Sequence, residues 1–237
     1  MTTETVGVTS DAGIAGTRDA SSGCVEIKEI LSCKGAQISK RGFDVVVSSA
    51  ALIFLLPLIV AMAGVLLLLQ GRPLFIRHNR VGLGGKSFPC LKFRSMVVNA
   101  DLVLRKHLSD NAAAREEWEE THKLKNDPRI TPIGKFLRKS SVDELPQLIN
   151  IIRGDMSLVG PRPIVRDEIV RYGLHIEDYK RVRPGLTGLW QVSGRNDTSY
   201  QDRVALDVRY VREWSFLRDL EIIAKTVPAV VKSSGSY

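Results

Sequence analysis

Two adjacent carboxylates, Asp143 and Glu144, are the residues of this sequence best suited by type and spacing to chemistry. They lie in the string SSVDELPQ, and Pro146 predicts that a helix begins near Asp143, because proline is tolerated only in the first turn of a helix. A helix start carries partial positive charge, which stabilises a carboxylate and an incoming phosphate. A carboxylate there can attack phosphorus and form an acyl phosphate. A structural interpretation fits too, with Asp143 as N-cap or Ser141 and Glu144 as a capping box.

Arginines flank this pair in segments stiffened by proline and glycine. Arg138 precedes the pair, and Arg162 lies between two prolines in the string GPRP. Arg183 opens a second rigid loop, RPGLTG, which continues to Arg195. An arginine in a fixed loop is suited to bidentate phosphate binding, whereas a solvated surface does not need its arginines locked between prolines. We therefore predict that these four arginines bind phosphate.

The elements expected to position these residues are mostly helical. Residues 73–80 and 88–96 are predicted strands, and the glycines at 82, 84 and 85 between them favour a hairpin turn. One helix is expected from position 100, capped by Asn99, through the acidic stretch 116–120. Further helices are expected over 132–139, from near 143, and over 200–231, whereas 153–163 and 181–197 are predicted loops.

An uncharged apolar run covers residues 45–69 and is long enough to span a bilayer. Pro57 divides the run into two halves of twelve residues, each about 18 Å long as a helix and too short to span alone. Both flanks are basic, with Lys40 and Arg41 before the run and Arg72 and Arg77 after it. Because cytoplasmic flanks carry the excess of lysine and arginine, this pattern fits a helix that enters and returns on one side. A kinked spanning helix fits as well, since membrane helices tolerate proline.

Composition limits the classes of function. The chain has 237 residues and a net charge of +8, which indicates an anionic partner such as nucleic acid, a lipid surface or a phosphorylated substrate. The long apolar run and the lack of a nucleic-acid-binding motif argue against nucleic acid. Three cysteines without metal-ligand spacing are predicted to be reduced thiols. A membrane-anchored scaffold without activity is the other rival, and the intact Asp143–Glu144 pair argues against it.

Several strings, taken together and in this order, resemble the bacterial sugar transferase family of monotopic polyprenol-phosphate phosphoglycosyl transferases. They are KRGFD at 40–44, LKFRSM at 91–96, DELPQ at 143–147, RGDMSLVGPRP at 153–163, RPGLTG at 183–188, QVSGRN at 191–196 and LDV at 206–208. The resemblance extends from about residue 39 to the end of the chain. It is closest to the transferases that start exopolysaccharide synthesis with galactose or glucose 1-phosphate.

The resemblance implies an α+β fold that is predominantly helical, with a re-entrant membrane helix broken at Pro57. It implies a flexible tail over residues 1–38, the re-entrant helix over 39–71, and a transferase domain over 72–237 that contains a small β-hairpin and interfacial helices. This domain is expected on the cytosolic face of the bacterial inner membrane.

The resemblance also implies a reaction. Asp143 attacks the β-phosphate of a UDP-hexose, UMP leaves, and undecaprenyl phosphate then takes the hexose 1-phosphate from the enzyme. Glu144 is implied as general base or as helper of Mg²⁺, the expected cofactor, for which Asp143 is the expected ligand. Lys92 joins the predicted phosphate-binding residues. The implied partners are UDP-hexose, undecaprenyl phosphate, membrane lipid and the glycosyltransferases that act next.

Overall fold

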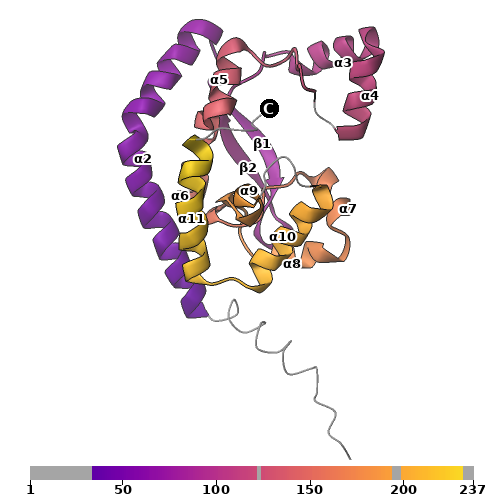
Figure 1. Ribbon diagram of the computed structural model, residues 1–237. Coiled ribbons are helices and arrows are strands. Elements are labelled where there is room, and N and C mark those ends of the chain that lie inside the picture. The colour runs from indigo at the N-terminus through magenta and orange to yellow at the C-terminus, as the bar shows by residue number, and fades with distance from the viewer. Residues whose placement is uncertain (1–33, 122–123, 194–198, 232–237) are drawn as a thin grey trace, which may run out of the picture.

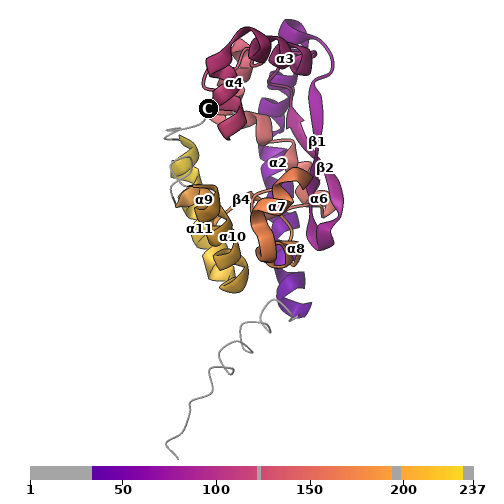
Figure 2. The same ribbon diagram turned by 90° about the vertical axis from the view of Figure 1, so that its right-hand side faces the viewer.

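The computed structural model describes residues 34–121, 124–193 and 199–231, and the domain packs against one side of a long N-terminal helix (Figure 1 and Figure 2). The predicted tail lies largely outside this range. The main elements, in chain order, are α2 (Lys34–Gln70), β1 (Phe75–Val81), β2 (Ser87–Phe93), α3 (Ala100–Asp110), α4 (Ala112–Thr121), α5 (Pro132–Ser140), α6 (Gln147–Arg153), β3 (Ser157–Val159), α7 (Ile169–Tyr172), α8 (Ile176–Lys180), β4 (Gly185–Thr187), α9 (Leu189–Val192), α10 (Tyr200–Arg212) and α11 (Phe216–Val231).

The predicted hairpin is confirmed. Strands β1 and β2 pair antiparallel, with His78 opposite Cys90 and Arg77 opposite Leu91. The turn between them contains Gly84 and Gly85, both with positive φ, which a glycine adopts without steric cost. A second sheet consists of the short parallel pair β3 and β4, in segments that were expected to be loops. The structure is therefore α+β and mostly helical, as predicted.

Helix α2 begins at Lys34, five residues earlier than expected, and continues to Gln70 with Pro57 inside it. Its 37 residues correspond to about 55 Å of helix. Figure 1 shows it as one bowed helix along the side of the molecule. Although proline removes one backbone hydrogen bond, the helical assignment is not interrupted at Pro57, so the expected break is not seen in the secondary structure.

Both halves of α2 pack on the rest of the chain. Phe43 and Val47 in the first half contact the core cluster that contains Leu148 and Ile151 of α6. In the second half, Met62 and Leu66 are buried in a separate cluster with Phe93 of β2 and Leu137 of α5. No residue from 49 to 61 is fully buried, although Ala51, Leu52 and Leu55 pack on the first cluster, and residues 56–58 around Pro57 are all exposed.

The outward face of α2 is apolar and exposed. Phe54 is 82% exposed and Leu68 is 86% exposed, and other large apolar side chains of α2 are exposed with them: Ile38, Val46, Ile53, Leu56, Leu58, Val60, Val65, Leu67 and Leu69. Soluble proteins rarely expose so large a contiguous apolar surface. Of the described helices, only α2 is long and apolar enough to cross a membrane. The surface therefore indicates association with a membrane.

A buried polar junction ties the start of α2 to α11. Lys40 donates to the carboxylate of Asp219 at 2.5 Å and to the carbonyl of Val159 at 3.2 Å. Asp219 also accepts hydrogen bonds from the Tyr210 hydroxyl at 2.8 Å and the Trp214 indole at 3.0 Å. This junction fixes α2, α10, α11 and β3 to one another.

Two of the helices predicted from sequence are divided in the structure. The one expected from position 100 separates into α3 and α4 at Asn111, whose side chain accepts a hydrogen bond from the Ala114 backbone N–H at 3.0 Å. The one expected over 200–231 separates into α10 and α11 at 213–215, where Trp214 turns inward to the buried junction. The helix expected over 132–139 is confirmed as α5.

Candidate active site

Asp143 and Glu144 lie in a tight turn between α5 and α6. Ser141 ends α5 with φ of 56°, a left-handed conformation that few residues other than glycine adopt. A single 3₁₀ turn over Val142–Glu144 follows, and α6 starts after Pro146. Neither carboxylate caps a helix, and Ser141 makes no capping hydrogen bond, so both capping interpretations are wrong. The Asp143 side chain, 7% exposed by residue, is thereby left available to the cavity that it lines.

The β-hairpin forms one wall of this cavity. Side chains alternate across a strand, so Ile76, His78 and Arg80 of β1 share a face, and Cys90 and Lys92 of β2 lie on the same side of the sheet. All five line the cavity. The hairpin therefore places two cationic side chains, Arg80 and Lys92, and two apolar ones, Ile76 and Cys90, in the wall beside the carboxylates.

Lys92 links the hairpin to the carboxylate turn. Its ammonium donates to Glu144 at 2.6 Å. Burial opposes a charge on Lys92, yet Glu144 and Asp143 outweigh it and raise the pKa of the lysine. Lys92 is therefore a fixed positive charge that pairs with Glu144 and lies near Asp143. On the other side of the turn, Arg138 donates from Nε to the Ser95 hydroxyl at 2.9 Å.

Two glycine-rich loops form the opposite wall. The loop after β3 carries Arg162, and β4 begins with Gly185. A Cβ on Gly185 would lie 2.1 Å from the backbone nitrogen of Gly160, so the two backbones approach too closely for any side chain. The remaining lining residues on this wall are Pro163, Leu186, Trp190, Gln191 and Arg203.

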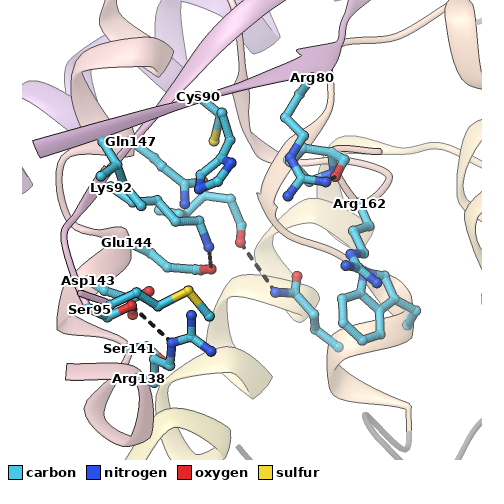
Figure 3. A pocket seen from close by; sticks show the side chains of 18 of the residues that line it. Arg80, Cys90, Lys92, Ser95, Arg138, Ser141, Asp143, Glu144, Gln147 and Arg162 are labelled. Atoms are coloured by element: carbon cyan, nitrogen blue, oxygen red, sulfur yellow. Dashed lines mark hydrogen bonds and ion pairs between the residues drawn. The ribbon is translucent and has the colours of Figure 1, made fainter. Parts of the chain in front are cut away.

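The cavity has a volume of about 620 Å³, within the range of ligand-binding clefts. Figure 3 shows Lys92, Asp143, Glu144 and Arg138 on one side of it and Arg162 across from them. Arg80, at the far end of the hairpin wall, lies near Arg162 and donates to the carbonyl of Pro163 at 3.4 Å. The enclosed space is strongly cationic around a carboxylate pair, which suits a substrate with several negative charges.

Burial changes the ionisation of Asp143. Removal from water raises the pKa of this carboxyl to about 6, although Lys92 and Arg138 act to lower it. A carboxylate with a pKa near 6 is ionised at neutral pH and is more basic than an ordinary aspartate. This combination of cleft, charge partners and shifted pKa marks Asp143 as the candidate nucleophile.

The structure brings most of the predicted site residues together. Asp143, Glu144, Lys92, Arg138 and Arg162 all line the cavity. Arg183 does not line it.

Instead, the Nε of Arg183 donates to the carbonyl of Gly154 at 2.8 Å, and the residue lines a small hollow of about 50 Å³ with Arg41 and Asp44 near the start of α2. Arg195 lies outside the described residues.

Sequence reasoning missed several lining residues. Arg129 is one of these lining residues. Its Nη2 lies 2.6 Å from the carboxylate of Asp127, and its guanidinium lies 5.0 Å from the centroid of the Trp118 ring. His78 was noticed only as one of four scattered histidines, and burial together with nearby Arg80 lowers its pKa. The strand predicted over 73–80 was the sequence signal that pointed to this wall, because His78 lies within it.

The carboxylate pair fits a divalent cation only in part. Asp143 and Glu144 offer the oxygen ligands that Mg²⁺ prefers, but the described residues contain no group of three or more His, Cys, Asp or Glu that could hold a metal by themselves. Mg²⁺ is commonly bound by one or two carboxylates together with substrate phosphates and water. The residues therefore fit an ion that binds along with a phosphorylated substrate.

Comparison with known proteins gives consistent matches over nearly the whole chain. The family described as bacterial sugar transferase matches residues 35–233. The exopolysaccharide production protein ExoY of Sinorhizobium fredii is 56% identical over 200 residues, which cover 84% of this chain and 88% of that protein.

Two further relatives carry the name of a reaction. The undecaprenyl-phosphate galactose phosphotransferase of Salmonella typhimurium is 48% identical over 90% of this chain and 44% of that protein. The UDP-glucose:undecaprenyl-phosphate glucose-1-phosphate transferase of Caulobacter vibrioides is 38% identical over 84% of this chain and 72% of that protein.

Proposed function

This chain belongs to the bacterial sugar transferase family, and we propose that it transfers hexose 1-phosphate, from UDP-galactose or UDP-glucose, to undecaprenyl phosphate. The family and its named relatives make the protein a phosphotransferase of exopolysaccharide synthesis. The observation that carries the detailed proposal is Asp143, a desolvated carboxylate with Lys92 and Arg138 around it and Arg162 across the cavity.

In the first half of the proposed reaction, a carboxylate oxygen of Asp143 attacks the β-phosphorus of the UDP-hexose. The bond from that phosphorus to the bridging oxygen breaks, and its electron pair leaves with UMP. The enzyme then holds the hexose 1-phosphate as an acyl phosphate. Partial desolvation supports this role, because a carboxylate removed from water is the more reactive nucleophile, and the raised pKa of Asp143 reflects that removal.

In the second half, an oxygen of undecaprenyl phosphate attacks the same phosphorus. The bond between phosphorus and Asp143 breaks, which regenerates the carboxylate and gives undecaprenyl-diphospho-hexose. Lys92 and Arg138 act in both halves by balancing the charge on the transferred phosphoryl group. Glu144, held 2.6 Å from Lys92, is placed beside the nucleophile and would orient it or act as general base.

Mg²⁺ is part of the proposal. Asp143, helped by Glu144, would hold the ion, and when bound it would neutralise charge on the diphosphate. The other groups of the site are positioned by the protein itself. Lys92 keeps Glu144 in place, and the hydroxyl of Ser95 orients Arg138.

The re-entrant arrangement is also part of the proposal. The two ends of α2 pack against the same domain, through Phe43 and Val47 at one end and through Met62 and Leu66 at the other. A helix that crossed the bilayer would carry one of these contacts, with its polar surroundings, to the far side. Packing of both ends therefore supports entry and return on the cytosolic face, with the exposed residues 56–58 around Pro57 deepest in the lipid. The exposed side chains Phe216 and Leu217 at the start of α11 would rest in the interface.

The activity is tested with purified full-length protein in detergent, undecaprenyl phosphate, Mg²⁺ and a panel of UDP-sugars. We expect release of UMP and formation of a lipid-linked sugar with UDP-galactose or UDP-glucose. With a UDP-sugar alone, intact-protein mass spectrometry should detect a mass increase of one hexose phosphate. Failure to release UMP from any member of the panel would refute the proposal.

The topology is tested separately by thiol labelling. Single cysteines at Ser39 and Ser87, both exposed positions, are placed in a background without the three native cysteines. Both should resist a membrane-impermeant reagent in intact cells and react after lysis. Pro57→Leu should move position 39 to the periplasm in part of the population, because it restores the backbone hydrogen bond that proline removes and so favours a straight apolar helix long enough to span. Labelling of position 39 in intact wild-type cells would establish a spanning helix instead.

A further inference from the structure

The position of Arg162 opposite Asp143 constrains where the nucleotide leaves, if the proposed function holds. Displacement at phosphorus places the attacking and leaving oxygens roughly in line. Figure 3 shows Asp143 and Arg162 on opposite sides of the cavity, so an attack from Asp143 directs the leaving oxygen toward the wall that carries Arg162. This wall should therefore receive the phosphate of the departing nucleotide.

Two arginines of that wall share one aromatic ring. The guanidinium of Arg162 lies 5.8 Å from the centroid of the Trp190 ring, and that of Arg203 lies 5.2 Å from it. Arg162 comes from the loop after β3 and Arg203 from α10, so the indole of α9 is what brings them together. Cation–π contacts of this kind are typically worth about 0.5–2 kcal/mol each and orient the planar guanidinium.

Arg162 and Arg203 bring two positive charges close together, and no acidic side chain in the described part of the chain neutralises Arg162. Burial and then repulsion from Arg162 lower the pKa of Arg203, which indicates that the two cations are close enough to oppose one another. Arg162 forms no ion pair with any acidic residue in the part of the chain that the structure describes. Its own backbone is fixed, since its N–H lies 3.4 Å from the buried carboxylate of Asp207 and Pro161 and Pro163 flank it. Two neighbouring guanidiniums on a fixed support are a site for a dianion.

We propose that Arg162 and Arg203, aligned by the indole of Trp190, form a clamp for the phosphate of the departing UMP. When the bond between the β-phosphorus and the bridging oxygen breaks, that oxygen keeps the electron pair and the α-phosphate goes from one negative charge to two. A dicationic clamp therefore binds the departing group more strongly than the intact donor, and it lowers the barrier of the first half-reaction. Trp190 is a positioning residue that acts through the two arginines.

The clamp is tested with UMP as the probe. The dissociation constant of UMP is measured by calorimetry on the full chain in lipid nanodiscs, and the KM for undecaprenyl phosphate is measured in parallel. Arg203→Gln and Trp190→Leu should each weaken UMP binding about tenfold, the scale of one charge-assisted hydrogen bond. The KM for undecaprenyl phosphate should change less than twofold. Trp190→Phe keeps an aromatic ring and should recover part of the lost affinity.

A matched control lies on the same helix. Arg209 of α10 is exposed and pairs with Glu213 at 3.1 Å, so Arg209→Gln removes the same charge from the same element without touching the cavity. UMP affinity should stay within twofold of wild type. Uridine inhibition separates phosphate from base: if Trp190 acts through the arginines, Trp190→Leu weakens UMP inhibition and leaves uridine inhibition unchanged.

Two results would overturn the clamp. One is UMP affinity within twofold of wild type in both Arg203→Gln and Trp190→Leu. The other is unchanged UMP affinity with a raised KM for undecaprenyl phosphate, which would assign the arginines to the lipid phosphate. Either result in an enzyme that forms the phosphosugar adduct leaves the proposed function standing, whereas a wild-type protein that neither binds nor releases UMP overturns both.

Discussion

Asp143 in the cavity and Asp219 at the junction of α2 with α11 are both buried carboxylates close to basic residues, and their surroundings differ. Asp219 accepts hydrogen bonds from Lys40, Tyr210 and Trp214, so each of its two oxygens has at least one donor. Asp143 receives no hydrogen bond from any side chain in the described part of the molecule, and burial raises its pKa to about 6. Protein donors hold one carboxylate in place, while the other is desolvated but left open to a ligand. Saturation of hydrogen bonds, more than burial, separates the structural aspartate from the reactive one.

The largest expected effect comes from removing the reactive carboxylate. Asp143→Asn should lower turnover by roughly 10³-fold or more, because loss of a covalent nucleophile commonly costs that much. The phosphosugar adduct should also disappear from the mass spectrum of the protein with UDP-sugar alone. Turnover near wild type in this variant would remove Asp143 from the mechanism.

Removing the structural carboxylate should affect stability instead of chemistry. Asp219→Asn leaves the partly buried Lys40 without its counter-charge and should lower the free energy of unfolding by about 3 kcal/mol. Thermal denaturation in detergent measures this, and kcat of the folded fraction should stay within about threefold of wild type. Glu221→Gln on the same helix is the control, since its pair with Lys225 is exposed and should contribute less than about 0.5 kcal/mol. A large fall in kcat with unchanged stability would contradict the distinction.

Arg162 and Arg183 each lie beside a proline, and a comparison of the two tests whether an arginine must line the cavity to affect catalysis. Arg162→Lys keeps the charge but loses the planar fork, and kcat/KM should fall about tenfold, or about 1.4 kcal/mol. Arg183→Lys makes the same change beside another proline, but outside the cavity, and should alter kcat/KM less than threefold. Equal losses would mean that Arg183 also reaches the substrate.

The smallest effect concerns pH. Because the reactive form of Asp143 is the carboxylate and its pKa is about 6, adduct formation should be half-maximal near pH 6 and fall about tenfold for each further unit of acidity. Rapid quench with UDP-sugar measures this rate. Burial also raises the pKa of Asp207, to about 7, so Asp207→Asn serves as control and should leave the midpoint near 6 in place. A midpoint near 4 would show that Asp143 is not desolvated during catalysis.

Local sequence predicted those elements whose limits are set by local chemistry. The hairpin follows from its glycine turn, and α5 begins where Thr131 and Pro132 supply a cap and a first-turn proline. The division between α3 and α4 was also readable, since Asn111 has the residue type of an N-cap. The end of α10 could not be predicted from local sequence. Trp214 leaves the helix to donate to Asp219, and only the folded junction specifies that contact.

The sequence likewise predicted only part of the functional site. Arg162 and Arg183 have the same local pattern, and which of them faces the cavity depends on how β3 and β4 pack. The sequence could not tell them apart. Trp190 and Arg203 carry no motif of their own, and they become candidates only when α9 and α10 place them beside Arg162. Asp143 and Glu144 alone fit a helix cap, and the arginines in rigid segments around them were what made them candidates for chemistry.

The ion pair between Lys40 and Asp219 also has a consequence for how the protein is made. The two residues are 179 positions apart, so α2 leaves the ribosome long before its partner exists. At about 5–20 residues per second, the interval is roughly 10 to 35 seconds. During that interval the partners of this apolar helix are completed one after another, β2 first, then α5 and α6, and α11 last. We therefore expect the helix to reach the lipid surface before α11 is made, so that the catalytic domain assembles on a segment that the membrane already holds.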